Sequence, residues 1–133
     1  MESSAVRLVV VRHAHADPGD PDELRPLSAR GRDEAQALAD ELAAEIGPVL
    51  VVTSPLLRAR ETAAPIARAA AAELRVDERL SPGAGLDEVL AAAEGVDGPV
   101  VAVGHQPDCS LIADALGVAL DFPPAGHAVF ELS

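Results

Sequence analysis

Continuous apolar runs alternate along the chain with segments whose apolar residues recur at helical spacing. Residues 6–11, 49–53 and 99–103 are almost uniformly apolar, which is typical of strands buried on both faces of a parallel sheet. Residues 74–76 and 127–132 carry weaker strand signals. We therefore expect a five-stranded sheet in which the three apolar runs form the interior.

Helices are predicted between these strands. Ser28 is a good N-cap, and apolar residues follow it at helical spacing until Gly47-Pro48 stops the helix. Ser54-Pro55 predicts the start of a second helix, which runs to about Ala72. Shorter helices are expected over 86–93 and from Gln106-Pro107 to near residue 117.

This alternation predicts a three-layer α/β/α fold with a mostly parallel sheet, in one domain over residues 1–133. Ligands of such sheets bind beyond the carboxyl ends of the strands. Residues 17–27, rich in Pro, Gly and Asp, are expected to be a loop.

Composition narrows the possible partners. The formal net charge is −12, so nucleic acid and anionic membrane surfaces are not expected as partners. Only 2% of the residues are aromatic, which leaves no stacking platform for bases. The single Cys109 rules out a disulfide within the chain. The single cysteine favours a cytoplasmic protein, and so does the polar segment 1–5, which does not resemble a signal sequence.

The few basic groups stand where the apolar strands end. The first strand runs into Arg12-His13, the second is followed by Arg58 in the first turn of its helix, and the fourth is followed by His105. Because parallel strands end at one edge of a sheet, we expect these four side chains to converge there. An anion bound among them would also be stabilised by the helix N-terminus.

Two of these residues, and Cys109, also have simpler interpretations. Arg58 could pair with Glu61 on the helix surface, which would contribute about 0.3 kcal/mol. His13 could be a buried core histidine or a metal ligand, although the remaining His and carboxylates do not fall at ligand spacings, so no metal is expected. Cys109 is interpreted as a small buried hydrophobe.

Four segments in sequence order resemble the histidine phosphatase superfamily, the phosphoglycerate-mutase-like group. They are "RHAHAD", "RPLSARGRDEAQALA", "TSPLLRARETA" and "VVAVGHQPD". The family signature Arg-His-Gly reads Arg12-His13-Ala14 here, and Glu34 stands where Gln is usual. The residues of these segments and the length of the chain are most similar to those of the small SixA-type phosphohistidine phosphatase branch.

The resemblance implies specific roles and one topological feature. His13 is the expected nucleophile, and Arg12, Arg58 and His105 are expected to bind the phosphate, with no cofactor. The last strand is expected to run antiparallel to the others. Larger relatives place a glutamate after the third strand as the proton donor, where this chain has Ser81-Pro82. The possible substitutes are Asp17, Glu78 and Asp87.

We therefore expect a metal-independent phosphatase that forms a phosphohistidine intermediate and dephosphorylates phosphohistidine on a protein partner. The missing acid favours this substrate because imidazole leaves more readily than an alkoxide. Two alternatives stay open: a phosphomonoesterase for small metabolites, and a non-catalytic module that binds phosphate. Two further histidines, His15 and His127, are expected at the rim or at a strand end, and the oligomeric state is left open.

Overall fold

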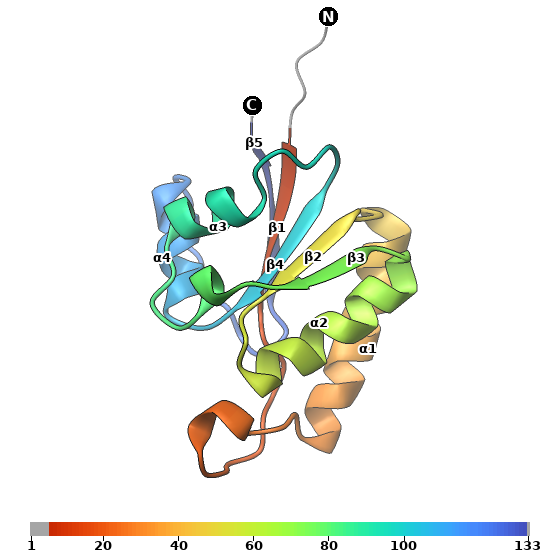
Figure 1. Cartoon of the computed structure of the whole chain (residues 1–133), viewed down its shortest axis with the longest axis vertical. Coiled ribbons are helices and arrows are strands. Elements are labelled where there is room, and N and C mark those ends of the chain that lie inside the picture. The colour runs from red at the N-terminus through yellow and green to blue at the C-terminus, as the bar shows by residue number, and fades with distance from the viewer. Residues whose placement is uncertain (1–5, 133) are drawn as a thin grey trace, which may run out of the picture.

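The computed structural model describes residues 6–132, so the polar segment 1–5 lies outside the described residues. Five strands and four helices follow one another along the chain (Figure 1). They are β1 (Val6–Arg12), α1 (Ala29–Glu45), β2 (Leu50–Thr53), α2 (Leu57–Ala70), β3 (Glu73–Val76), α3 (Leu86–Ala92), β4 (Val100–Gly104), α4 (Asp108–Ala115) and β5 (His127–Leu132). Two short 3-10 turns, η1 (Asp22–Leu24) and η2 (Glu78–Leu80), lie in the connections.

The strands form one mixed sheet in the order β3-β2-β4-β1-β5. β1, β2, β3 and β4 pair in parallel, whereas β5 runs antiparallel to β1. The predicted fold class and the antiparallel last strand are therefore confirmed. The parallel register sets Arg12 opposite Gly104, so the ends of β1 and β4 deliver their following residues to the same edge.

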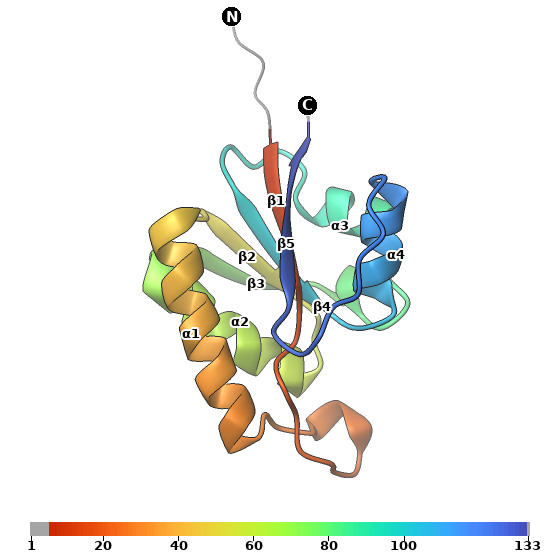
Figure 2. The same cartoon turned by 180° about the vertical axis from the view of Figure 1, so that it is seen from behind.

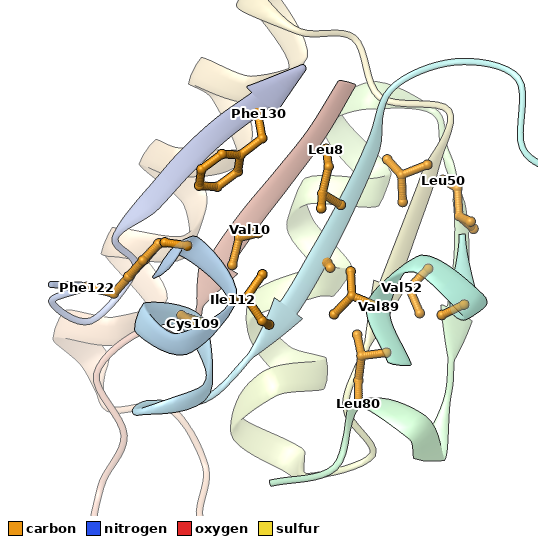
Figure 3. Packing of buried hydrophobic residues seen from close by; sticks show 14 residues of the cluster. Leu8, Val10, Leu50, Val52, Leu80, Val89, Cys109, Ile112, Phe122 and Phe130 are labelled. Atoms are coloured by element: carbon orange, nitrogen blue, oxygen red, sulfur yellow. The ribbon is translucent and has the colours of Figure 1, made fainter. Parts of the chain in front are cut away.

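Helices cover both faces of this sheet (Figures 1 and 2). α1 and α2 lie on one face, and α3 and α4 lie on the other. Alternate residues of β1 point to opposite faces: Val9 and Val11 pack under α1 and α2, while Leu8 and Val10 pack under α3 and α4 (Figure 3). Burial on both faces explains why these strands are uninterrupted apolar runs.

Two helices begin later than the sequence predicts. α2 starts at Leu57 rather than at Ser54-Pro55, because Leu56 is still extended and is the N-cap, while the Ser54 hydroxyl bonds to the Leu56 amide and to His105. α4 starts at Asp108, with Pro107 as its N-cap. The N-cap predicted for α1 is confirmed, since Ser28 Oγ accepts a hydrogen bond from the Gly31 amide at 3.0 Å.

Candidate active site

The four predicted site residues lie together at the carboxyl edge of the sheet. The His13 amide donates to the Gly104 carbonyl at 3.0 Å, which joins the chain after β1 to the end of β4. The imidazole rings of His13 and His105 lie 5.3 Å apart between centroids. Burial lowers the pKa of both histidines, and the charges of Arg58 and Arg12 lower it further, so all four groups share one electrostatic environment.

His13 is held in one tautomer. Its Nδ1 lies 2.7 Å from the Ala14 carbonyl oxygen, which can only accept, so Nδ1 carries the hydrogen and Nε2 carries the lone pair. Burial lowers the pKa of His13 to about 4, the charges of Arg58, Arg12 and Arg25 lower it as well, and the Ala14 bond opposes them. The ring is therefore neutral at neutral pH and remains partly exposed, as a nucleophile must be.

His105 is buried and is oriented through Ser54. Ser54 Oγ accepts from the Leu56 amide at 3.2 Å and lies 2.8 Å from His105 Nε2. The Ser54 hydroxyl has no other acceptor among the described residues, so its hydrogen is directed at Nε2 and Nδ1 carries the ring proton. Burial, the nearby His13 and the charge of Arg58 lower the pKa of His105 to about 4.

Two buried nitrogens at this site have no hydrogen-bond partner within residues 6–132. They are Arg12 Nε and His105 Nδ1. Arg12 Nη1 donates to the Phe122 carbonyl at 2.9 Å, which fixes the guanidinium and leaves Nε available. Buried donors without partners are rare in proteins, and an oxyanion between these residues would satisfy both of them.

Arg58 enters the site from the first turn of α2, but its partner is not Glu61. Its Nη1 donates to the Asp22 carbonyl at 2.9 Å, and its Nη2 lies 3.1 Å from the Asp22 carboxylate. Glu61 instead accepts a hydrogen bond from the Leu27 amide at 2.8 Å. The simpler interpretation of Arg58 as one half of a helix-surface ion pair is therefore wrong.

Thr62 joins the histidine segment to the arginine helix. Its hydroxyl accepts from the Ala14 amide at 2.9 Å and donates to the Arg58 carbonyl at 2.8 Å. Both bonds are buried, so this single side chain sets the position of His13 relative to the first turn of α2.

The "RPLSARGRDEAQALA" block holds the chain just after His13. The Glu34 carboxylate accepts from the His15 amide at 3.0 Å, a bond that the usual glutamine could also form. Gly31 faces the backbone of His15 so closely that a Cβ there would overlap the His15 carbonyl oxygen. A glycine is therefore required at this contact for steric reasons.

The three expected substitutes for the acid do not join this cluster. Asp17, Glu78 and Asp87 are exposed, and within the described residues their carboxylates make no hydrogen bond to the four site residues. The structure instead brings Asp22 onto Arg58 and buries Asp108 three residues after His105, where its carboxylate accepts from the Gly83 amide at 2.7 Å.

Sequence reasoning missed four functional contacts, those of Asp22, Arg25, Ser54 and Thr62. The signals were present but weak. Arg25 belongs to the "RPLS" block, Ser54 stands at a strand end, and Thr62 follows Arg58 by one helical turn. Nothing local to Asp22, in a loop rich in Pro and Asp, indicates that it reaches Arg58.

Within residues 6–132, the side chains of the other chemically interesting residues make no hydrogen bond to the four site residues. Cys109 is buried, and burial raises the pKa of its thiol to about 12, as expected of a small core residue. His15 Nδ1 lies 2.7 Å from Ser28 Oγ at the start of α1, and His127 lies 3.7 Å from Glu41. Residues 6–132 contain no group of three His, Cys, Asp or Glu side chains arranged to hold a metal ion.

Comparison with known proteins agrees with this geometry. Residues 8–82 match the family described as histidine phosphatase superfamily (branch 1). The chain belongs to that superfamily. An uncharacterized protein of Picosynechococcus sp. (strain ATCC 27264 / PCC 7002 / PR-6) is 36% identical over 126 residues, which cover 87% of this chain and 69% of the relative.

Solved structures place the chain in the SixA-type branch of this superfamily, and it is a phosphatase. A protein assigned as phosphohistidine phosphatase SixA of Nakamurella multipartitia has a TM-score of 0.77 and 27% identity, covering 97% of this chain and 86% of its own. A mycobacterial glucosyl-3-phosphoglycerate phosphatase, solved with VO3, has a TM-score of 0.72 and 25% identity, covering 92% and 90%.

None of the helices in the described part of the chain combines the length and the hydrophobicity that a membrane span needs.

Proposed function

We propose that this phosphatase works through a phosphohistidine intermediate on His13 and dephosphorylates phosphohistidine on a protein partner. The observation that carries the proposal is the state of His13. Its Nδ1–H is engaged by the Ala14 carbonyl, so the Nε2 lone pair is free in a ring that is neutral at neutral pH. Among Arg12, His13, Arg58 and His105, His13 alone combines a free lone pair with partial exposure to solvent.

The first step would form a bond between His13 Nε2 and phosphorus while the bond from phosphorus to the leaving nitrogen breaks. Negative charge on the phosphoryl oxygens is then stabilised by Arg12, Arg58 and His105, whose free donors include Arg12 Nε and His105 Nδ1. Removal of one such donor typically costs about 3 kcal/mol of transition-state stabilisation. The departing imidazole takes up a proton from solvent.

The second step would return the enzyme to its starting state. A water oxygen bonds to phosphorus, the bond to His13 Nε2 breaks, and orthophosphate leaves. The positive charge that both steps need comes from guanidinium groups, so neither step uses a metal ion. A chelator is therefore expected to leave the activity unchanged.

Two structural observations favour a protein-borne substrate. The His13 ring stays partly exposed although the longer connection of residues 13–28 lies beside it, and two other connections at this edge are short, residues 54–56 and residues 105–107, so the site is open to solvent. Among the described residues, neither carboxylate near the site is free to protonate an alkoxide leaving group, since Asp22 is engaged by arginines and Asp108 by the Gly83 amide.

A cytoplasmic location stays a prediction from the single cysteine.

A small metabolite is the second candidate substrate. It is favoured by the likeness to the mycobacterial glucosyl-3-phosphoglycerate phosphatase, whose substrate is an alkyl phosphate. The non-catalytic module considered above is set aside, because the chain is a phosphatase.

The substrate test compares kcat/KM for a phosphohistidine-bearing protein with kcat/KM for a panel of sugar and glycerate phosphates. We expect the phosphohistidine protein to be preferred, with rates unaffected by chelator. A clear preference for one of the sugar or glycerate phosphates would overturn the proposed substrate. Loss of activity on chelation, restored by a divalent ion, would overturn the metal-free chemistry.

A further inference from the structure

The mouth of the site carries a carboxylate that the phosphatase chemistry described above does not use. Asp22 belongs to the 3-10 turn η1, which lies beyond the carboxyl ends of β1 and β4 (Figure 1). Its side chain is 60% exposed, whereas the Arg58 side chain that it contacts is only 9% exposed. Asp22 therefore covers a buried guanidinium from the solvent side.

Asp22 spans two cations. One carboxylate oxygen lies 3.1 Å from Arg58 Nη2, and the other accepts from Arg25 Nη1 at 3.2 Å. Arg25 is anchored in turn, since its Nε donates to the Asp17 carbonyl at 2.9 Å. The charge of Arg25 reaches the site, because it contributes to the lowered pKa of His13.

The backbone keeps this turn in place. The Asp17 amide donates to the Pro26 carbonyl at 2.9 Å and closes the loop at its base. Within the loop, the Arg25 amide donates to the Asp22 carbonyl at 3.1 Å, and the Asp22 carbonyl also receives Arg58 Nη1. The carboxylate is thus presented by an ordered turn that is held at both its base and its tip.

The charges of the side chains at the site indicate which substrate charge the site favours. Arg12, Arg25 and Arg58 bring three positive charges to the site, and Asp22 neutralises one of them. The two remaining charges match one phosphoryl dianion. A second anionic group on the substrate would find its cations already paired and would face the negative charge of Asp22.

We propose that Asp22 is a specificity-determining residue, which occupies the guanidinium N–H groups that a second anionic group of the substrate would need. The site then accepts a single phosphoryl group and disfavours phosphate esters that carry a carboxylate beside it. This inference rests on the proposed function, since it assumes that the phosphoryl group binds between Arg12, Arg58 and His105.

The ionisation of Asp22 agrees with this role. Hydrogen bonds from Arg25 and Arg58 hold the pKa of Asp22 below its usual value, so the carboxylate is charged at neutral pH and does not serve as a proton donor. Glu23, on the same turn, is exposed and makes no side-chain hydrogen bond within the described residues. It offers a matched control for the general effect of removing one negative charge.

The experiment measures binding with two ligands that differ only at the end of the molecule remote from the phosphate. Glycerol 3-phosphate and 3-phosphoglycerate have similar phosphate groups, but the second carries a carboxylate. Dissociation constants are measured by calorimetry for the wild type, Asp22→Asn, Asp22→Ser and Glu23→Gln, with thermal unfolding as a check on folding.

We expect the wild type to favour glycerol 3-phosphate, and Asp22→Asn to raise the relative affinity for 3-phosphoglycerate by about tenfold, the effect of one nearby like charge in a partly solvated site. Asp22→Ser should act in the same direction, and Glu23→Gln should leave the ratio close to that of the wild type. An unchanged ratio in both Asp22 variants, or an equal loss of affinity for both ligands, would overturn the inference and leave the proposed function intact. If neither ligand bound the wild type, the phosphate site itself would be wrong, and with it the proposed function.

Discussion

The imidazole rings of His13 and His105 lie 5.3 Å apart between centroids and are tilted by 58° relative to each other. Each ring has one nitrogen engaged by a defined partner, the Ala14 carbonyl for His13 and the Ser54 hydroxyl for His105. The remaining nitrogen of His13, Nε2, carries a lone pair, and the remaining nitrogen of His105, Nδ1, carries a hydrogen that it can donate. The same fold thus presents a free lone pair on one imidazole and a free N–H donor on the other.

This pairing predicts the acid limb of the activity. The pKa of each histidine is lowered to about 4, so both rings are neutral at pH 7 and take up protons only as the pH approaches 4. Because neutral His13 is the attacking form, kcat/KM corrected for substrate ionisation should stay level through pH 6.5 and fall only toward pH 4. A pH profile measures this directly. A fall centred at 6.5, the ordinary histidine value, would contradict the described environment of His13.

Ser54→Ala is expected to lower kcat/KM by about 10- to 100-fold, because His105 loses the hydroxyl that holds its tautomer and orientation. The loss should fall on kcat more than on stability, since the ring of His105 stays buried. Steady-state kinetics and thermal unfolding of the variant measure the two effects. Ser110→Ala is the matched control, because Ser110 bonds to Gln106 rather than to His105. Equal activity in Ser54→Ala and Ser110→Ala would show that Ser54 does not position His105.

Thr62→Val keeps the shape of the side chain and removes both of its hydrogen bonds. The buried Ala14 amide would lose its partner, so we expect the free energy of unfolding to fall by about 1–3 kcal/mol, together with a loss of activity as His13 shifts relative to Arg58. Chemical denaturation and kinetics on the same preparation measure both. Thr53→Val serves as the comparison, because the Thr53 hydroxyl bonds only to the neighbouring Ser54 carbonyl. If the two variants behaved alike, Thr62 would be an ordinary core residue.

The three layers of the fold could be predicted from the sequence because buried positions require apolar residues. The apolar runs of β1, β2 and β4 and the Ser28 cap of α1 follow from local physical chemistry, and the structure contains them. The predicted start of α2 was wrong because the backbone stays extended through Leu56, where Ser54 bonds both to the Leu56 amide and to His105.

The contacts of the site could be predicted only in part. Convergence at the sheet edge follows from topology, which is why the four side chains of Arg12, His13, Arg58 and His105 were expected together. The partner of Arg58 could not be predicted, because Asp22 lies in a loop whose path depends on backbone bonds such as that between Asp17 and Pro26. The Phe122 carbonyl that fixes Arg12 is a backbone group, and residue type carries no information about where a carbonyl points.

The central claim is that His13 Nε2 becomes phosphorylated. The most direct measurement is to quench the enzyme during turnover of a chromogenic phosphate ester, locate the phosphoryl group by mass spectrometry, and identify the ring isomer by phosphorus NMR. The account predicts an acid-labile, base-stable phosphoenzyme on Nε2 of His13, absent in His13→Ala and retained in His15→Ala. A phosphoryl group on another residue or on Nδ1, or turnover that survives His13→Ala, would contradict it.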